Sequence, residues 1–309
     1  MQTMAYLNGE LIDSRDLTIS PTDAGFVLGT TVTEQLRTFG GELFRLEDHL
    51  QRLEESLHVV GITTSRKPHE LADAARDLVM ANRPAIQPED DLGLCIFATP
   101  GPYRTFEPQA KNGPNVGMHT YQLPFDLWSH QYTEGARLIV SQHRQTDPES
   151  WPLSLKCRSR LHYYLADQQV RASDAGARAL LLNRHGQVSE TSTANVVAYY
   201  ESEGVVSPPR HQILPGISLQ HLQEIADDVG IAFCERSLTP DELLAADEVL
   251  LTSTPFCILP VTQLNGAPIG TGKPGAVGTR LLAVWGNSVD IDIVAQAQRF
   301  SVRKEAPNR

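Results

Sequence analysis

Two hydrophobic periodicities alternate along the N-terminal third of the chain. The segment M-A-Y-L-N-G-E-L-I-D places an Asn-Gly turn between apolar flanks, which predicts a β-hairpin. Leu50, Leu53, Leu57 and Val60 recur at helical spacing and predict an amphipathic helix over residues 46–60. Further elements expected here are a strand in V-T-E-Q-L-R-T-F, a helix over residues 69–82, and strands over residues 92–98 and 116–122. The pattern predicts an α+β unit with a largely antiparallel sheet.

The alternation stops in Q-L-P-F-D-L-W, where Pro124 marks an expected domain boundary. Beyond it, strands and helices alternate again. We expect strands over residues 136–142, 179–182, 196–200 and 248–252, and helices over residues 158–172, 218–229 and 276–285. The fold class predicted is α+β with two domains. These are a smaller N-terminal α/β domain of residues 1–123, a linker of residues 124–130, and a larger C-terminal domain of residues 131–309.

Composition narrows the class of protein. With 309 residues the chain is long enough for two domains, and 41% hydrophobic with 20% charged residues is typical of a soluble globular protein. The formal net charge of −11 argues against a general affinity for nucleic acid or anionic membranes, and no apolar run reaches the length of a membrane span. The first ten residues lack the basic and apolar regions of a signal peptide, so we expect a cytoplasmic, reducing setting.

Three familiar catalytic or binding motifs are absent from the sequence. The stretch G-T-G-K-P-G at residues 270–275 lacks the spacing and the Ser or Thr of a phosphate-binding P-loop. There is no G-x-S-x-G nucleophile motif and no H-E-x-x-H metal motif. The four cysteines form no C-x-x-C pair, so we expect no metal site.

A different set of motifs follows a fixed order. Lys156 lies in P-L-S-L-K-C-R-S-R-L, and Glu190, 34 positions later, lies in S-E-T-S-T-A-N-V-V. Next come I-L-P-G-I-S at residues 213–218 and A-D-E-V-L-L-T-S-T-P at residues 246–255. This order and spacing resemble the fold-type IV pyridoxal-phosphate enzymes, also called class IV aminotransferases. The resemblance covers nearly the whole chain, since I-S-P-T-D-A-G-F-V-L-G and E-D-H-L-Q-R-L also fit.

The resemblance implies pyridoxal 5'-phosphate as cofactor and assigns residues to it. An amine nucleophile has to hold the cofactor aldehyde as a Schiff base, and Lys156 matches that residue, whose alternative is a solvated surface lysine. Glu190 matches the carboxylate that keeps the pyridine nitrogen protonated; its alternative is a solvated turn residue. The cofactor phosphate is a dianion and needs donors. The matching cofactor-binding positions are Arg52, Gly216, Ile217, Ser218, Ser253 and Thr254.

Departures from the family pattern bear on the substrate. Thr33 stands where many members carry an aromatic residue, and Pro255 stands where branched-chain enzymes offer a backbone N–H to the substrate carboxylate. Proline has no N–H, so we expect an arginine, Arg37 or Arg104, to bind that carboxylate instead.

The leading interpretation is an aminotransferase that moves an amino group between an amino acid, most of all of the branched-chain type, and a 2-oxo acid. K-C-R-S-R-L also resembles the matching stretch of aminodeoxychorismate lyases, so a lyase is one alternative. Others are a D-amino-acid or (R)-amine transaminase, and an inactive binding module of the same fold. The resemblance further implies a homodimer or higher homo-oligomer.

Overall fold

The computed structural model describes residues 3–110 and 112–303 and divides into two compact units. Unit 1 comprises Met1–Leu123 together with Ser154–Arg160, and unit 2 comprises Pro124–Leu153 and Leu161–Arg309. The expected linker, residues 124–130, therefore groups with unit 2. The segment around Lys156, expected in the C-terminal domain, groups with unit 1.

Within the described residues, unit 1 is built on a six-stranded antiparallel sheet of order β2-β1-β6-β5-β3-β4. The strands are β1 (Met4–Leu7), β2 (Glu10–Asp13), β3 (Val32–Phe39), β4 (Glu42–Leu43), β5 (Leu92–Thr99) and β6 (Asn115–Gln122). The α-helices are α1 (Ala24–Val27), α2 (Leu46–Val60) and α3 (Pro68–Asn82). Asn8 and Gly9 both adopt positive φ between β1 and β2, which is the geometry that an Asn-Gly hairpin turn requires.

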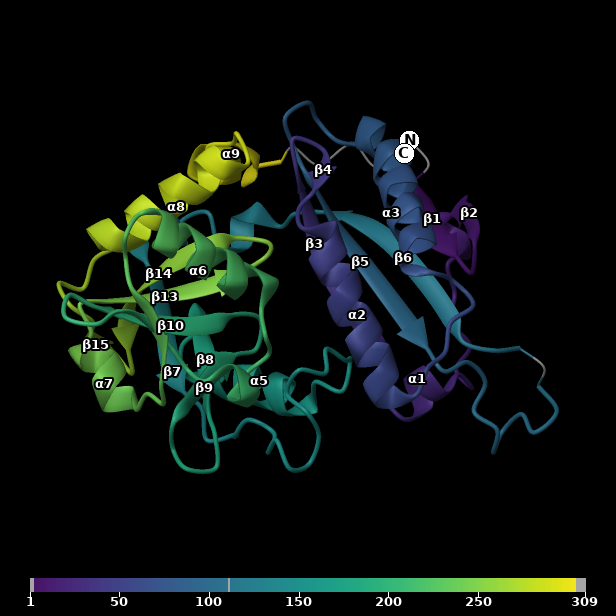
Figure 1. Cartoon of the computed structure of the whole chain (residues 1–309), viewed down its shortest axis with the longest axis horizontal. Helices are drawn as coiled ribbons and strands as arrows, with labels where there is room; N and C mark the ends of the chain where they lie inside the picture. Colours follow the sequence, from purple (N-terminus) through teal and green to yellow (C-terminus); the bar gives the residue numbers. More distant parts are fainter. Residues whose placement is uncertain (1–2, 111, 304–309) are drawn as a thin grey trace. The chain divides into compact units, whose positions relative to one another are not determined.

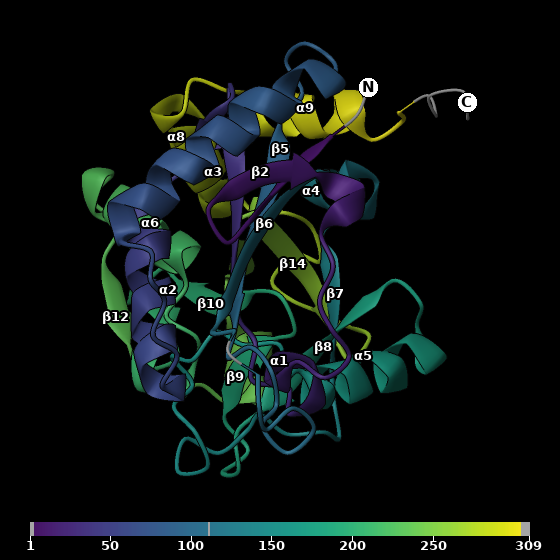
Figure 2. The same ribbon diagram turned by 90° about the vertical axis from the view of Figure 1, so that its right-hand side faces the viewer.

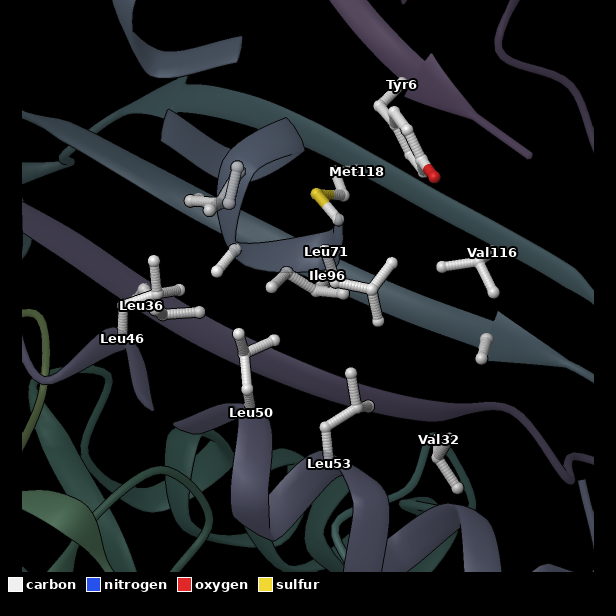
Figure 3. Packing of buried hydrophobic residues seen from close by; sticks show 14 of the residues in the cluster. Tyr6, Val32, Leu36, Leu46, Leu50, Leu53, Leu71, Ile96, Val116 and Met118 are labelled. Carbon is white, nitrogen blue, oxygen red and sulfur yellow. The ribbon is translucent and has the colours of Figure 1, made fainter. Parts of the chain in front are cut away.

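The core of unit 1 lies between the sheet and one pair of helices. Helices α2 and α3 pack against each other and against the sheet (Figures 1 and 2). Leu50 and Leu53 of α2 meet Ile96 of β5 and Met118 of β6 in one buried cluster (Figure 3). The helical spacing of the leucines thus becomes a buried stripe, which is the main source of stability for such a helix.

Within the described residues, unit 2 holds a nine-stranded sheet of order β12-β11-β10-β13-β14-β7-β8-β9, with β15 paired to β14. Strand β9 also pairs with β10 through Glu190 and Asn195, so the strands from β10 to β9 close into a ring. The strands are β7 (Ala136–Val140), β8 (Ala177–Leu182), β9 (Val188–Thr191), β10 (Asn195–Tyr200), β11 (Gly204–Ser207), β12 (Phe233–Glu235), β13 (Glu248–Ser253), β14 (Cys257–Leu264) and β15 (Ala267–Pro268).

Helices surround this sheet. Helices α6 and α8 pack on β13, α8 also on β14, and α5 on β8 (Figure 1). The helices of unit 2 are α4 (Gln131–Glu134), α5 (Leu161–Ser173), α6 (Ile217–Asp228), α7 (Pro240–Ala245), α8 (Ala276–Ser288) and α9 (Ile293–Phe300). No helix in the described part of the chain is long and apolar enough to cross a membrane.

The start of α5 differs from the prediction. A helix was expected from residue 158, but α5 begins at Leu161. The backbone N–H of Arg158 donates to Thr31 O at 2.8 Å, and Ser159 Oγ donates to Gly29 O at 2.6 Å. These hydrogen bonds hold the residues after Lys156 in an extended path, so the helix begins only beyond them.

Candidate active site

The backbone of Lys156 is held beside strand β3 of unit 1. Thr33 N donates to Lys156 O at 3.0 Å, and Lys156 N donates to Ser56 Oγ of α2 at 3.2 Å. The next residue, Cys157, forms a β-bridge with Val32. Lys156 is half-buried. A lysine on an ordinary surface loop would lack this attachment to two elements of a packed unit.

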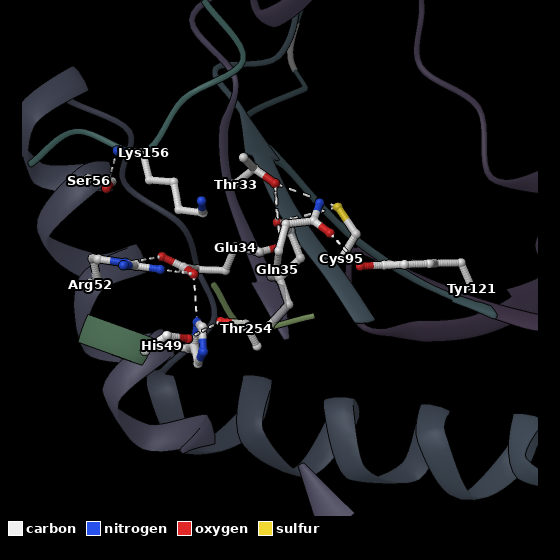
Figure 4. Close-up of polar contacts among 12 residues, drawn as sticks. Thr33, Glu34, Gln35, His49, Arg52, Ser56, Cys95, Tyr121, Lys156 and Thr254 are labelled. Atoms are coloured by element: carbon white, nitrogen blue, oxygen red, sulfur yellow. Dashed lines mark hydrogen bonds and ion pairs between the residues drawn. The ribbon is translucent and has the colours of Figure 1, made fainter. Parts of the chain in front are cut away.

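A buried cluster of charges lies on α2 and β3 in the same unit. Arg52 donates to both carboxylate oxygens of Glu34, from Nε and from Nη2, at 2.8 Å each. His49 Nδ1 lies 2.7 Å from Glu34 Oε2 (Figure 4). Because residues three apart on a helix share a face, His49 and Arg52 both meet Glu34. The two-point contact fixes the plane of the Arg52 guanidinium.

Electrostatics in this cluster favour an ionised carboxylate. Burial alone would raise the pKa of Glu34, but the charge and hydrogen bonds of Arg52 and a hydrogen bond with His49 hold it far below its usual range. Burial lowers the pKa of His49, against the opposing effect of Glu34. The Glu34 carboxylate thus retains its charge and keeps Arg52 in place.

Glu190 lies at the point where β9 and β10 of unit 2 meet. Its side chain is buried, at 4% exposed. Oε1 accepts from Gln145 Nε2 and from the Tyr163 hydroxyl, each at 2.7 Å. Oε2 accepts from Asn195 Nδ2 at 3.2 Å and from Leu214 N at 3.3 Å. These neutral donors solvate a buried carboxylate without neutralising it, as a partner for a pyridinium nitrogen requires.

The N-terminus of α6 supplies donors of another kind in the same unit. The helix begins after Gly216, and no side chain caps its first turn. A helix start of this type leaves free N–H groups and a partial positive charge. Ser218 Oγ lies 3.3 Å from Thr254 Oγ1, which brings two hydroxyl groups together there. Uncapped N–H groups with two hydroxyls fit a phosphate dianion.

Gly216 is required by its neighbour. A Cβ at this position would lie 2.1 Å from Asn195 Oδ1, too close for any side chain. Asn195 in turn donates to Glu190 and, at 2.9 Å, to Leu214 O. The start of α6 and the Glu190 network are therefore built from shared residues, and together they fit a ring nitrogen and a phosphate group of pyridoxal phosphate.

The remaining predicted residues have other surroundings. Ile217 is buried, and Ser253 Oγ donates to Thr193 O at 2.7 Å. Pro255 follows Thr254 and is half-buried. Thr33 is buried, and its hydroxyl donates to Ile96 O at 3.0 Å.

The two arginines expected to bind a substrate carboxylate are placed otherwise. Arg37 is fully buried, lies 4.0 Å from Asp91 Oδ2, and stacks over the Phe39 ring. Arg104 is exposed and donates to Ala110 O in its own loop. Binding a substrate through Arg37 would strand the buried Asp91, which carries a large free-energy penalty. We therefore do not retain Arg37 for this role.

Some residues of these clusters were not singled out from the sequence. His49 carried a usable signal, because it precedes Arg52 by three residues in E-D-H-L-Q-R-L and so shares its helix face. Gln145 carried none: it lies in the loop H-R-Q-T-D-P and reaches Glu190 only through the fold.

Comparison with known proteins gives a consistent result. The family model described as amino-transferase class IV matches residues 31–264. The chain is 29% identical over 285 residues to D-alanine aminotransferase of Bacillus licheniformis, covering 91% of this chain and 95% of that one. It is also 29% identical to D-alanine aminotransferase of Staphylococcus aureus strain N315, covering 89% and 94%.

Solved structures of similar fold are branched-chain amino acid aminotransferases. That of Escherichia coli superposes with a TM-score of 0.84 at 23% identity, covering 93% of this chain and 94% of that one. That of T.th., solved with pyridoxamine 5'-phosphate, gives a TM-score of 0.84 at 25% identity, covering 94% of each chain. The fold is that of the fold-type IV enzymes, and the cofactor is pyridoxal phosphate. The chain belongs to the class IV aminotransferases.

Proposed function

We propose that this aminotransferase takes its amino group from an α-amino acid with an apolar side chain and transfers it to a 2-oxo acid. Two kinds of similarity support the apolar donor. The curated relatives are named for D-alanine, and the solved structures are named for branched-chain amino acids. Both substrates share an α-carboxylate and an aliphatic side chain. We place a branched-chain donor first, and D-alanine is the second candidate because the sequence relatives favour it.

Residue roles follow from the contacts described. Bound pyridoxal phosphate supplies an aldehyde that accepts the amino group and a ring that takes up electrons from the substrate carbon. Lys156 binds that aldehyde and carries the proton to and from the substrate carbon. Glu190 keeps the ring nitrogen protonated. The N-terminus of α6 with Ser218 and Thr254, and Arg52 oriented by Glu34, hold the phosphate.

The observation that carries this assignment is the setting of Glu190. Its buried carboxylate accepts hydrogen bonds from Gln145, Tyr163 and Asn195. Hydrogen bonds to the charged form favour that form and fix the direction of its oxygens. Because these donors carry no charge, they leave the carboxylate able to attract a cation, and a pyridinium nitrogen is such a group.

The test is a panel of amine donors with 2-oxoglutarate as acceptor. We expect glutamate to form from L-leucine and L-isoleucine faster than from glycine or from amines without a carboxylate. A higher rate with D-alanine would select the second candidate. Release of pyruvate from a donor without any acceptor would instead indicate a lyase, and no transfer from any apolar amino acid would refute the proposal.

A further inference from the structure

The sheet of unit 1 has one apolar face and one polar face. Leu94 and Ile96 of β5 point into the core with α2 and α3. Because side chains alternate along a strand, Cys95 points the opposite way, together with the residues that the register places beside it. This polar face consists of Thr33 and Gln35 on β3, Cys95 and Phe97 on β5, and His119 and Tyr121 on β6.

Two glycines let aromatic rings lie across this face. Gly117 is opposite Phe97, and a Cβ there would lie 2.3 Å from the Phe97 ring. Gly93 is opposite Tyr121, and a Cβ there would lie 2.2 Å from its ring. The Tyr121 hydroxyl donates to Gln35 Oε1 at 2.9 Å, which holds that ring down (Figure 4). The polar face therefore has an aromatic floor.

Arg158 lies on the same side as Lys156. Leu155 packs against the core, and Cys157 pairs with Val32, which also faces the core. In this extended segment Lys156 and Arg158 alternate with them, so both point to the polar face. The spacing of two residues on an extended chain is roughly 6–7 Å. A cation thus follows the proposed catalytic amine at the distance of a small substrate.

Arg158 and His119 line a pocket on this face. Its other walls include Phe97 and residues around α1, among them Phe26 and Gly29. Arg158 is exposed, and its Nη2 lies 3.1 Å from Cys95 Sγ. The only acceptor recorded for this guanidinium in the described part of the chain is thus a thiol sulfur, a weaker partner than a carboxylate.

Charge in the pocket favours an anion. A hydrogen bond with Cys95 raises the pKa of His119. Burial alone would raise the pKa of Cys95, but the hydrogen bond with His119 and the charge of Arg158 lower it. Two basic groups therefore stand over an aromatic floor, which complements a ligand with one carboxylate and an apolar remainder.

On the premise of the amino acid transfer proposed above, we infer that Arg158 binds a carboxylate of the substrate, in the place expected of Arg37 or Arg104. The guanidinium moves its hydrogen bond from Cys95 to the carboxylate, and Phe97 contacts the apolar part. The carboxylate is either the α-carboxylate common to all substrates or the distal one of a dicarboxylic 2-oxo acid.

The experiment measures binding of 4-methylvalerate, which has a carboxylate and no amine, to the cofactor-loaded enzyme by calorimetry. It also measures kcat/KM for pyruvate and for 2-oxoglutarate with a fixed donor. Arg158→Met should weaken the carboxylate contact roughly 10- to 150-fold, as expected for a hydrogen bond to a charged group, while Arg158→Lys retains part of it. Losses in 4-methylvalerate and both oxo acids indicate the α-carboxylate, and a loss confined to 2-oxoglutarate indicates the distal one.

Arg76→Met is the matched control, because Arg76 is an exposed arginine on α3 of the same unit that pairs with Glu47 and Asp73. Retention of the visible cofactor absorbance in Arg158→Met shows that the variant is folded and loaded. If its affinity for 4-methylvalerate and both kcat/KM values match those of Arg76→Met, the inference is wrong. That outcome leaves the amine transfer of the wild type intact, so it is distinct from failure of the proposed function.

Discussion

Two buried carboxylates in this protein are stabilised in different ways. Glu34 is fully buried and held by Arg52 and His49, so its charge is compensated inside the protein. Glu190 is surrounded by the amides and hydroxyl of Gln145, Asn195 and Tyr163, which solvate the charge. The first arrangement suits a positioning residue, and the second suits a residue that must still attract a positive group.

Glu190→Gln tests the second arrangement. The amide has nearly the same shape but cannot keep a pyridine nitrogen protonated, so the variant should bind cofactor yet lose activity. Losing a charged hydrogen bond of about 2–3 kcal/mol predicts a fall in kcat of roughly 30- to 150-fold. Steady-state kinetics and cofactor absorbance measure the two effects. Glu201→Gln, at an exposed position, is the control. Wild-type turnover in Glu190→Gln would exclude the role.

At the scale of elements, the start of α6 depends on the ring closure of the unit 2 sheet. β9 and β10 meet at Glu190 and Asn195, and Asn195 leaves no space for a side chain at Gly216. The uncapped first turn of α6 is thereby placed next to the Glu190 network. The two proposed anchor points for the cofactor, ring nitrogen and phosphate, are coupled through one asparagine.

Gly216→Ala tests this coupling. The new Cβ would displace Asn195, and overpacking of this kind costs about 1–3 kcal/mol. We expect weaker cofactor binding, measured by titration of the apoenzyme with pyridoxal phosphate, and a lower melting temperature. Gly113→Ala is the control, because a Cβ there meets no atom within 4 Å. Equal cofactor affinity in the two variants would contradict the coupling.

The elements of unit 1 were predictable, and several of unit 2 were not. The hairpin, α2, α3 and the long strands of unit 1 have clear periodicity and a turn signal, and the structure confirms them. Strand β14 was missed because C-I-L-P-V-T-Q-L contains Pro260, which normally indicates an edge strand, yet β14 lies between β13 and β7. Helix α9 was missed although its apolar face is buried.

Local motifs also indicated the cofactor residues better than the substrate residues. Lys156, Glu190 and Ser218 lie in short stretches whose spacing carries the family pattern. Contacts such as Gln145 with Glu190, or Arg158 with Cys95, join residues 45 and 63 positions apart. No local pattern encodes such pairs, so they appear only in the folded chain. Arg37 was misjudged because its partner Asp91 is similarly distant in sequence.

For the whole molecule, buried ionisable groups predict sensitivity to acid. His49 has a folded-state pKa below its ordinary 6.5, so the unfolded chain binds this proton first as pH falls. Glu34 has a folded-state pKa below its ordinary 4.5, with the same consequence at lower pH. Both contributions are complete above the unfolded-state pKa values and are lost on acidification, so unfolding becomes easier from about pH 6.5 downward.

His49→Gln separates the two contributions. The amide can still donate to Glu34, but it does not titrate, so the loss of stability between pH 7 and pH 5.5 should be shallower than in the wild type by up to ~1.4 kcal/mol per pH unit. Urea denaturation at several pH values measures the slope. Wild-type and variant curves that run parallel would show that His49 is not the titrating group.

The central claim is that Lys156 is the amine that binds the cofactor. Borohydride reduction of the yellow, cofactor-loaded enzyme fixes the cofactor on that amine, and mass spectrometry of the digested protein locates it. We predict the modification on the peptide containing Lys156 and its absence, together with loss of turnover, in Lys156→Ala. A modification on any other lysine, or turnover that survives in Lys156→Ala, would contradict the account.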